Sequence, residues 1–311
     1  MAKSAKSAKS ARSKVEIFRK DFITLARRAG GSYRTIAERT RIAHQFLQHL
    51  NNTGIKLRQV DSLKARYIES YIRQRLDGGI GKRTLQNEMS AMRAILSEAG
   101  KHKLADPQNE RLNNRALGLS GASRDGTKSP MSPEQFKTVF SAIEKKDPGV
   151  AATMQLSYVL GLRNKEAVQS AKSLDTWKRT LEKGGNKINV VFGTKGGRPR
   201  ETTIIDRERV LQAVNYALKY TQEHEGKLVD KPDMRSAMDR YRNVLRRAGM
   251  TGECSPHSMR YAYAENSGQF HEANGLNDKE VLAMISMDLG HGDGRGRYIA
   301  QVYRQTNDEG E

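Results

Sequence analysis

The sequence S-P-H-S-M-R at residues 255–260 and the sequence L-G-H-G-D-G-R-G-R-Y-I-A-Q-V-Y-R at residues 289–304 lie near the end of the chain. Serine followed by proline is a helix-start signal, and it predicts a helix beginning at Pro256. His257 and Arg260 would then lie three residues apart on one face of that helix. Arginine binds two phosphate oxygens through its planar guanidinium, and histidine moves a proton near neutral pH. The pair therefore suits a phosphate ligand, although the same spacing is common on helices that only face solvent.

Two further cations stand upstream of these stretches. Arg163 follows an apolar helix end and a glycine in Y-V-L-G-L-R-N-K-E, so we expect it to be buried beside an anion. Glu166 could form a structural salt bridge with Arg163, or it could orient Arg163 toward a phosphate. Lys195 falls at the tip of a predicted hairpin, where glycines would let the loop follow a groove. A lysine at such a tip is more often only solvated.

The composition points to a polyanionic partner. A chain of 311 residues suits two domains, and its net charge of +20 attracts polyanions, of which nucleic acid is the commonest. A ribosomal or membrane-surface role would fit the same charge. Residues 1–130 hold 27 basic and 11 acidic residues, against 28 and 24 in residues 131–311. Residues 1–130 are therefore predicted to bind DNA through general electrostatic contacts.

Several other classes of protein are disfavoured by what the sequence lacks. Cys254 is the only cysteine, so an intrachain disulfide is excluded and a reducing cytosol is favoured. No apolar run approaches the ~18 residues of a membrane span, and the start of the chain has no apolar core of a secretory signal. Residues 1–14 are predicted to be a disordered basic arm, which could lie along phosphates or serve only as a solubilising tail. No metal site is expected, because no pair among Cys254, His257, His271 and His291 has zinc-ligand spacing.

Residues 15–118 are predicted to form a compact helical domain. Apolar residues recur at three- and four-residue steps in four segments, separated by glycines. The helices are predicted to start at Val15, after a Ser32 cap, at Asp61 and near Thr84. The cations of this surface lack acidic partners, which favours phosphate contact over a merely solvated face. The candidate DNA-binding residues are Arg34, Arg39, Arg41, Lys82, Arg83 and Arg93.

Residues 119–130 are predicted to be a linker, and residues 131–311 a second domain that is mainly α with a small antiparallel β-sheet. Ser132 opens this domain with an N-cap, a proline and a capping-box Gln135. The stretches K-I-N-V-V-F-G and E-T-T-I-I-D are rich in β-branched residues and predict a hairpin around Lys195, with Arg198 in its turn. Asp206 is predicted to cap the helix that follows.

Taken together, these motifs resemble those of the tyrosine recombinase (phage integrase) family. Arg163 in G-L-R-N-K-E matches the family's first arginine, and Lys195 in G-T-K-G-G-R matches its hairpin lysine. H-S-M-R matches the H-x-x-R box at His257 and Arg260, and L-G-H-G supplies His291. The resemblance spans about residues 15–305, and the four-helix front domain is similar to the family's SAM-like core-binding domain. This implies an α+β catalytic domain behind it.

The resemblance also implies a reaction. A tyrosine hydroxyl would attack a DNA phosphodiester, forming a 3′-phosphotyrosine and releasing a 5′-hydroxyl, with neither metal nor ATP. Arg163, Arg260 and His291 would stabilise charge on the phosphate oxygens. Lys195 would protonate the leaving oxygen, and His257 would assist proton transfer.

The identity of the nucleophile is the point at which the sequence departs from the family pattern. The family's tyrosine usually follows the second histidine by about nine residues, or two and a half helical turns. Here Tyr298 and Tyr303 follow His291 by 7 and 12 residues. Tyr303 is preferred, because G-D-G-R-G-R resembles a small insertion and Tyr303 shares an apolar stripe with Ile299 and Val302. Tyr298 remains the alternative.

The leading hypothesis is a site-specific DNA recombinase, the integrase of a mobile genetic element. A type IB-like topoisomerase and a DNA-binding protein without cleavage activity are the alternatives. The implied partners are double-stranded DNA at specific sites, three further copies in a homotetramer on DNA, and accessory directionality or DNA-bending proteins. The expected location is the cytoplasm, in the bacterial cytosol or nucleoid, without membrane contact.

Overall fold

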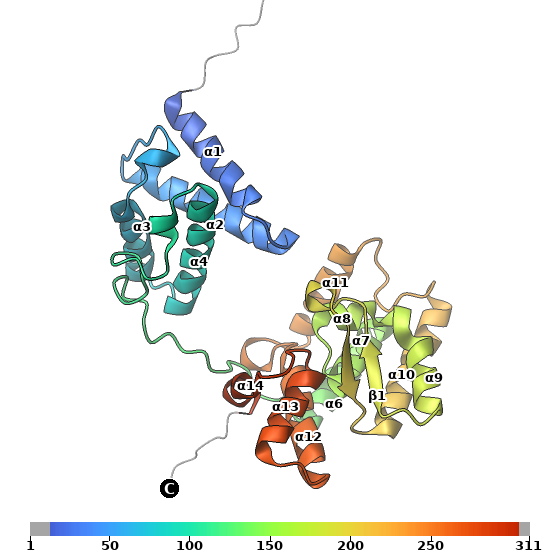
Figure 1. The fold of residues 1–311 in the computed structure, drawn as a ribbon. Coiled ribbons are helices and arrows are strands. Elements are labelled where there is room, and N and C mark those ends of the chain that lie inside the picture. Colours follow the sequence, from blue (N-terminus) through green and yellow to red (C-terminus); the bar gives the residue numbers. More distant parts are fainter. Residues whose placement is uncertain (1–12, 305–311) are drawn as a thin grey trace, which may run out of the picture. The chain divides into compact units, whose positions relative to one another are not determined.

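A computed structural model describes residues 13–304 of the chain. The chain divides into two compact units between Ser123 and Arg124, a position inside the predicted linker. We call them the N-terminal and C-terminal units (Figure 1). Residues 1–12 of the predicted basic arm lie outside the described residues. Within residues 13–304, no helix is both long and apolar enough to span a membrane.

The N-terminal unit is helical, as predicted. Its elements are α1 (Lys14–Arg28), α2 (Tyr33–Asn52), the 3-10 turn η1 (Val60–Ser62), α3 (Ala65–Asp77), α4 (Lys82–Glu98) and the short α5 (His102–Ala105). Ser13 and Glu16 form a capping box at α1, and Ser32 caps α2. The apolar stripes meet in one core, where Phe22 and Phe46 pack with ring centroids 5.4 Å apart.

One predicted helix start in this unit is wrong. Asp61 lies in η1, and α3 begins only at Ala65. An acidic residue in a short 3-10 turn resembles a helix start in sequence. Leu63 after it is buried with an extended backbone, so the chain turns into the core before the helix begins.

The C-terminal unit is mainly α with one two-stranded sheet, as predicted. The elements before the sheet are α6 (Pro133–Glu144), α7 (Pro148–Leu160), α8 (Asn164–Gln169), η2 (Ser170–Ser173) and α9 (Leu174–Glu182). The sheet is β1 (Lys187–Val190) and β2 (Arg200–Thr203), with the 3-10 turn η3 (Lys195–Gly197) between them. The later elements are α10 (Arg207–Glu223), α11 (Met234–Arg247), η4 (Gly252–Cys254), α12 (Ser258–Ala273), α13 (Asp278–Asp288) and α14 (Gly296–Tyr303).

Helix α7 forms the centre of this unit. It is buried along almost its whole length and packs against α6, α10 and α12. The sequence explains this position, because α7 carries no charged side chain between Pro148 and Leu160. Gly161 ends the helix in the left-handed conformation, and a Cβ there would lie 2.5 Å from the Tyr263 ring. The turn that leads to Arg163 therefore lies tightly against α12.

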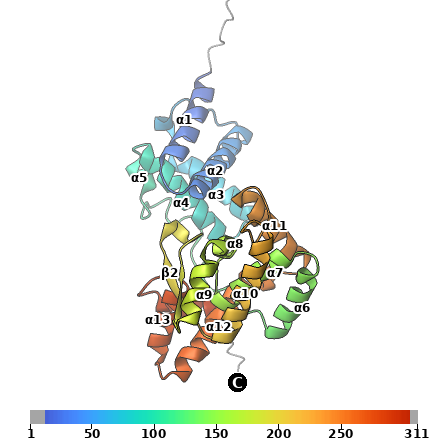
Figure 2. The same ribbon diagram turned by 90° about the vertical axis from the view of Figure 1, so that its right-hand side faces the viewer.

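The hairpin places one face inward and one outward. The strands are antiparallel, with Ile188 opposite Thr202 and Val190 opposite Arg200. β2 runs beside α13, as Figure 2 shows. Because side chains alternate along a strand, Arg200 and Thr202 point into the unit. An arginine is thereby brought into the interior beside α13.

Two local predictions differ from the structure in this unit. Helix α12 begins at Ser258, so His257 is its N-cap residue and Pro256 precedes the helix. Helix α9 was not predicted. It contains Trp177, which is buried and donates to the Asn189 carbonyl at 2.7 Å. Helix α9 has only 9 residues, so it has too few turns for its apolar residues to show a clear helical period.

Candidate functional site

The Tyr303 hydroxyl is the point at which the predicted site residues meet. It lies 3.4 Å from Arg260 Nε, 3.4 Å from His257 Nε2 and 3.5 Å from His291 Nε2. Tyr303 is the last residue of α14, and it is 5% exposed. Residues separated by more than 40 positions in the chain thus converge on one phenol oxygen.

Arg260 anchors this cluster from within the protein. It is fully buried in the first turn of α12, where one guanidinium nitrogen donates to the Gly161 carbonyl at 2.5 Å and another donates to the Leu289 carbonyl. Only Nε remains directed at Tyr303. Burial lowers the pKa of Arg260 but leaves it far above neutrality, so a fixed positive charge faces the phenol.

Arg163 approaches the same loop from the other side. It is the N-cap residue of α8, and its Nη2 donates to the Leu289 carbonyl at 3.0 Å. Its Nη1 lies 2.7 Å from Glu166 Oε1. Glu166 also accepts from the Arg163 backbone N–H at 2.8 Å. Glu166 thus forms the expected salt bridge with Arg163 and fixes the position of its guanidinium.

Arg200 is a residue that the sequence analysis did not single out. Its Nη2 donates to Glu166 Oε2 at 2.8 Å and to the Gly161 carbonyl at 3.2 Å, while its Nη1 donates to the Asp288 carbonyl. Burial by itself would raise the pKa of Glu166, but the charge and hydrogen bond of Arg200 outweigh it and lower that pKa to about 2. The signal that could have found Arg200 is the period of two in β2, which puts it on the inward face with Thr202.

These contacts close into a ring that we call the arginine ring. Arg163 and Arg260 share the Leu289 carbonyl, and Arg260 and Arg200 share the Gly161 carbonyl. Glu166 joins Arg200 back to Arg163. The ring fixes α8, β2, α12 and the loop before His291 relative to one another. Such fixed cations can stabilise charge on a phosphate without reorganising.

The two histidines are held neutral by their surroundings. Burial, together with the charges of Arg260, Arg163 and Lys128, lowers the pKa of His257 to about 4, although the residue keeps an exposed face in the cleft. Burial and the charges of Arg260, Arg163 and Lys195 lower the pKa of His291 to about 3. Near pH 7 both imidazoles are therefore neutral in the free protein and can accept a proton.

A cleft of about 1080 Å³ opens onto this cluster. Lys195 and Arg198 are exposed on the hairpin turn and line the cleft with Arg163, His257 and Tyr303. Lys195 lies in η3, where Gly196 takes a positive φ of 71° that allows the tight turn. The hairpin thus presents two exposed cations to the cleft that Tyr303 also lines.

Tyr298, the alternative nucleophile, occupies a different place. It is 40% exposed at the cleft, with its ring centroid 5.0 Å from that of His291 and 6.3 Å from that of Tyr303. No hydrogen bond is recorded from its hydroxyl to Arg260 or to either histidine, all of which lie in the described part of the chain. The geometry therefore favours Tyr303.

The predicted DNA-binding residues of the N-terminal unit divide into exposed and buried sets. Arg34, Arg41, Lys82 and Arg83 are exposed, as expected. The expectation that these cations lack acidic partners is wrong for Arg41, which pairs with Glu38 at 2.6 Å. The prediction that Arg39 lies on the surface is wrong. It is 7% exposed and donates to the Ala26 and Gly30 carbonyls at 3.2 and 2.9 Å, tying the end of α1 to α2. Arg93 is half-buried and donates to the Leu112 carbonyl at 2.8 Å.

A basic face in the C-terminal unit was also missed. Helix α11 buries Ala237, Tyr241 and Leu245, and its opposite side is exposed. The exposed arginines of this helix are Arg235, Arg240, Arg242, Arg246 and Arg247. The helical period of the apolar residues was the available signal, since it leaves these arginines facing solvent.

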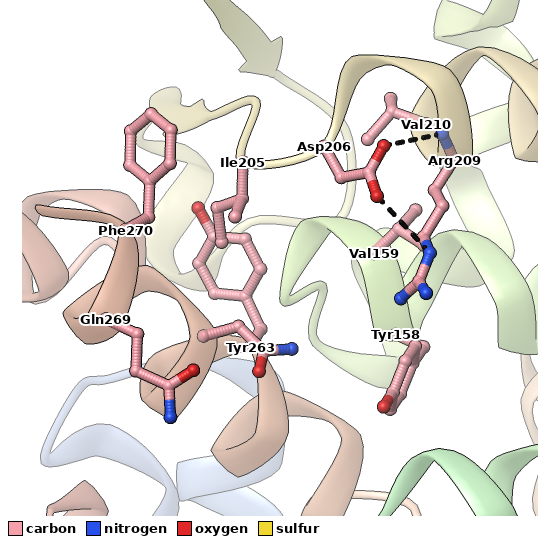
Figure 3. Close-up of a pocket in the computed structure, with 10 residues that line it drawn as sticks. Tyr158, Val159, Ile205, Asp206, Arg209, Val210, Tyr263, Gln269 and Phe270 are labelled. Atoms are coloured by element: carbon pink, nitrogen blue, oxygen red, sulfur yellow. Dashed lines mark hydrogen bonds and ion pairs between the residues drawn. The ribbon is translucent and has the colours of Figure 1, made fainter. Parts of the chain in front are cut away.

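A second cavity, of about 330 Å³, lies between α7, α12 and the start of α10 (Figure 3). Its walls are the rings of Tyr158, Tyr263 and Phe270 and the ion pair of Asp206 with Arg209, whose atoms lie 3.3 Å apart. It contains none of the predicted site residues. Within residues 13–304, no cluster of three His, Cys, Asp or Glu side chains could hold a metal ion.

Comparison with known proteins gives matches in both units. The model of the phage integrase N-terminal family matches residues 15–105, and the model of the Integrase family matches residues 118–266. Tyrosine recombinase XerD of Corynebacterium glutamicum is 25% identical over 265 residues, which cover 81% of this chain and 84% of that protein.

Solved structures show the same fold. A lambda integrase dimer bound to a COC′ core site has a TM-score of 0.58 at 14% identity, covering 95% of this chain and 79% of that one. XerH site-specific recombinase bound to a palindromic difH substrate has a TM-score of 0.57 at 12% identity, covering 97% of each chain. With integrase family models matching both units and a tyrosine recombinase matching across them, the chain belongs to the tyrosine recombinase (phage integrase) family of site-specific recombinases.

Proposed function

We propose that the chain is the integrase of a mobile genetic element and that it cleaves and rejoins DNA through a 3′-phosphotyrosine. The observation that carries this proposal is the position of the Tyr303 hydroxyl, within 3.5 Å of Arg260, His257 and His291. A phenol surrounded by two neutral imidazoles and a fixed guanidinium can lose its proton to an imidazole and be stabilised as phenolate.

In the proposed first step, the Tyr303 oxygen attacks the phosphorus and the bond from phosphorus to the 5′ oxygen breaks. The Tyr303 proton passes to His257, which its lowered pKa keeps neutral near pH 7. Lys195 donates a proton to the departing 5′ oxygen from its exposed position in the cleft. Arg163, Arg260 and His291 hold the nonbridging oxygens. Rejoining reverses these transfers, and the covalent bond conserves the energy of the phosphodiester, so neither ATP nor a metal is needed.

The proposed partner is double-stranded DNA with a specific attachment or recombination site. The exposed Arg34, Arg41, Lys82 and Arg83 of the N-terminal unit and the arginine face of α11 would contact its phosphates. Lambda integrase has been solved as a tetramer on a Holliday junction, which supports a homotetramer on DNA here. Directionality or DNA-bending proteins are proposed as accessory partners, and the bacterial cytoplasm as the location.

Trapping of the covalent intermediate tests this function. The substrates are nicked suicide duplexes that cover the ends of the encoding element and its insertion site. The wild-type protein is expected to form a covalent adduct that survives denaturing electrophoresis, and Tyr303→Phe to form none. Tyr298→Phe is the matched control and should keep the adduct, because its hydroxyl has no role in attack.

Three outcomes would contradict the proposal in different ways. If the adduct disappears in Tyr298→Phe and persists in Tyr303→Phe, the nucleophile is Tyr298 and not Tyr303. Relaxation of supercoiled plasmids of any sequence would assign the protein to the topoisomerases. Binding without an adduct on every duplex would leave a protein that only holds DNA.

A further inference from the structure

The chain enters the C-terminal unit alongside the helix that carries Tyr303 (Figure 1). We call residues 125–128 the strap. The Gly126 N–H donates to the Gln301 carbonyl at 3.3 Å, and the Gln301 side-chain amide donates to Asp125 Oδ1 at 2.9 Å. Both contacts are made by Gln301, which lies two residues before Tyr303 in α14. The strap is therefore bound to the last turn of α14.

Gly126 lies closer to α14 than any side chain would allow. A Cβ on Gly126 would lie 2.1 Å from the Val302 carbonyl oxygen and 3.0 Å from the Tyr261 hydroxyl oxygen. Its backbone lies outside the left-handed region, so close approach rather than backbone freedom requires glycine here. The closest atom belongs to the residue directly before Tyr303.

Tyr261 lies between Gly126 and the ring of Tyr303. It is buried, and its ring centroid lies 4.6 Å from that of Tyr303 and 5.6 Å from that of His257. Gly126 therefore lies against the residue that packs directly beside Tyr303. Displacement of the strap would reach Tyr303 through both Val302 and Tyr261.

The other end of the strap is fixed to the segment that carries His257. The Lys128 ammonium donates to the Gly252 carbonyl at 2.6 Å. A few residues on, the Met131 N–H donates to the Ser258 carbonyl at 3.3 Å. The charge of Lys128 also contributes to the low pKa of His257. One short segment thus joins the start of α12 to the end of α14.

We propose that the strap is a positioning element, in which Gly126 and the Asp125–Gln301 bond hold the Tyr303 hydroxyl in line with the phosphate site. This inference rests on the proposed function, because it assumes that Tyr303 is the nucleophile. Helix α14 has other anchors, namely the buried Ile299 and Val302 and the Arg304–Glu272 ion pair at 2.7 Å. Loss of the strap should therefore misplace the Tyr303 hydroxyl while α14 stays folded and packed in the C-terminal unit.

Gly126→Ala is the principal test, with Gly81→Ala as its matched control. Gly81 is also outside the left-handed region, and a Cβ there would meet no atom within 4 Å. With saturating suicide substrate, Gly126→Ala is expected to slow single-turnover adduct formation by about tenfold or more, since small misplacements of reacting atoms cost rates of this order. The dissociation constant for DNA should stay within about twofold of wild type, because the misplaced group does not supply ground-state affinity. Gly81→Ala should match wild type in both.

Two milder variants separate positioning from damage to the fold. Asp125→Ala and Gln301→Ala remove the side-chain bond without adding atoms, and each should slow adduct formation about threefold, a loss comparable to one hydrogen bond. The slowing in the double variant should be less than the product of the two single effects, because both substitutions remove the same bond. Full additivity would overturn the assigned pairing.

Hydrogen exchange gives a readout that does not depend on cleavage. In Gly126→Ala the amides of α14 should exchange faster, while those of the central helix α7 should be unchanged. If the wild-type protein forms no adduct on any duplex, the proposed function fails and this exchange result still decides whether the strap holds α14. Unchanged α14 exchange, a wild-type cleavage rate in Gly126→Ala, or a loss of DNA affinity equal to the loss of rate would each overturn the inference.

Discussion

At the residue scale, the candidate site combines a buried phenol with two histidines that cannot easily become charged. Burial lowers the pKa values of His257 and His291, and the guanidinium groups of Arg260 and Arg163 that face them lower both further. A DNA phosphate entering the cleft would offset those charges and raise the same pKa values. In the proposed reaction, this rise in pKa would let His257 take a proton from Tyr303 when the phosphate arrives.

The low histidine pKa values predict an acid-sensitive C-terminal unit. The unfolded chain binds protons at His257 and His291 below pH 6.5, whereas the folded unit does not until about pH 4 and 3. The unfolded state therefore binds more protons in this window, and the free energy of unfolding should fall as pH is lowered from 6.5 to 4.5. Glu166, with a pKa of about 2, would add acid sensitivity only below this window.

Urea unfolding followed by fluorescence of Trp177, the only tryptophan, measures this effect in the C-terminal unit. His257→Gln should show a shallower fall between pH 6.5 and 4.5 than the wild-type protein, because one of the two groups is gone. An equal or steeper fall in the variant would show that His257 is not held neutral.

At the element scale, a two-residue alternation in β2 brings a charged side chain into the interior. Arg200 faces inward beside Thr202, and its guanidinium completes the arginine ring through Glu166. A Cβ on Gly290 would lie 2.5 Å from Arg200 Cδ, so the loop before His291 packs directly on this side chain. The strand thereby fixes the loop that presents a predicted catalytic histidine.

Breaking the arginine ring should be costly to the C-terminal unit. Glu166→Gln leaves the buried Arg200 without its counter-charge, and loss of one partner of a buried pair costs about 3 kcal/mol or more. Glu201→Gln in the same strand is the control, because its pair with Lys187 is exposed and 3.8 Å long and is worth about 0.5 kcal/mol or less. Trp177 fluorescence in urea measures both, and equal losses would mean that the ring does not stabilise the unit.

At the scale of the whole molecule, the charge of +20 is spread over two units with different tasks. Cations of the N-terminal unit are exposed and can contact phosphates, although Arg41 is paired with Glu38 at 2.6 Å. The arginine ring instead uses its cations on carbonyls and one carboxylate. Only the exposed cations, and not those of the arginine ring, should contribute to the salt dependence of DNA binding. The slope of that dependence is set by the number of phosphates that the protein neutralises.

Arg34→Ala should therefore affect DNA binding, whereas Arg39→Ala should affect the stability of the N-terminal unit. Arg34 is exposed, and its loss should weaken DNA binding and reduce the slope of log affinity against log salt by about one. Arg39 is buried on two carbonyls, so its loss should lower the stability of the N-terminal unit and leave the slope unchanged. Fluorescence anisotropy over a salt series distinguishes the two, and an unchanged slope in Arg34→Ala would remove that residue from the interface.

Local patterns were sufficient to predict most of the helices, the hairpin and the family. Ser32, Ser132 and Asp206 begin helices as predicted, because a capping side chain acts within three residues of itself. The failures at this level were also local: Asp61 lies in a 3-10 turn, and α9 is too short for its period to be read. The order of the basic motifs was enough to identify the family, since a motif is a contiguous stretch of chain.

The tertiary structure alone decided which tyrosine meets the cluster and which arginines are free. Tyr298 and Tyr303 lie on one short helix, and the packing of that helix on α12 and α13 directs the Tyr303 hydroxyl toward Arg260. Arg39 and Arg200 read as ordinary surface cations in sequence. In the structure Arg39 donates to the Ala26 and Gly30 carbonyls, and Arg200 donates to the Asp288 carbonyl and Glu166. Burial and hydrogen-bond partners are properties of residues brought together by folding, and one-dimensional spacing does not contain them.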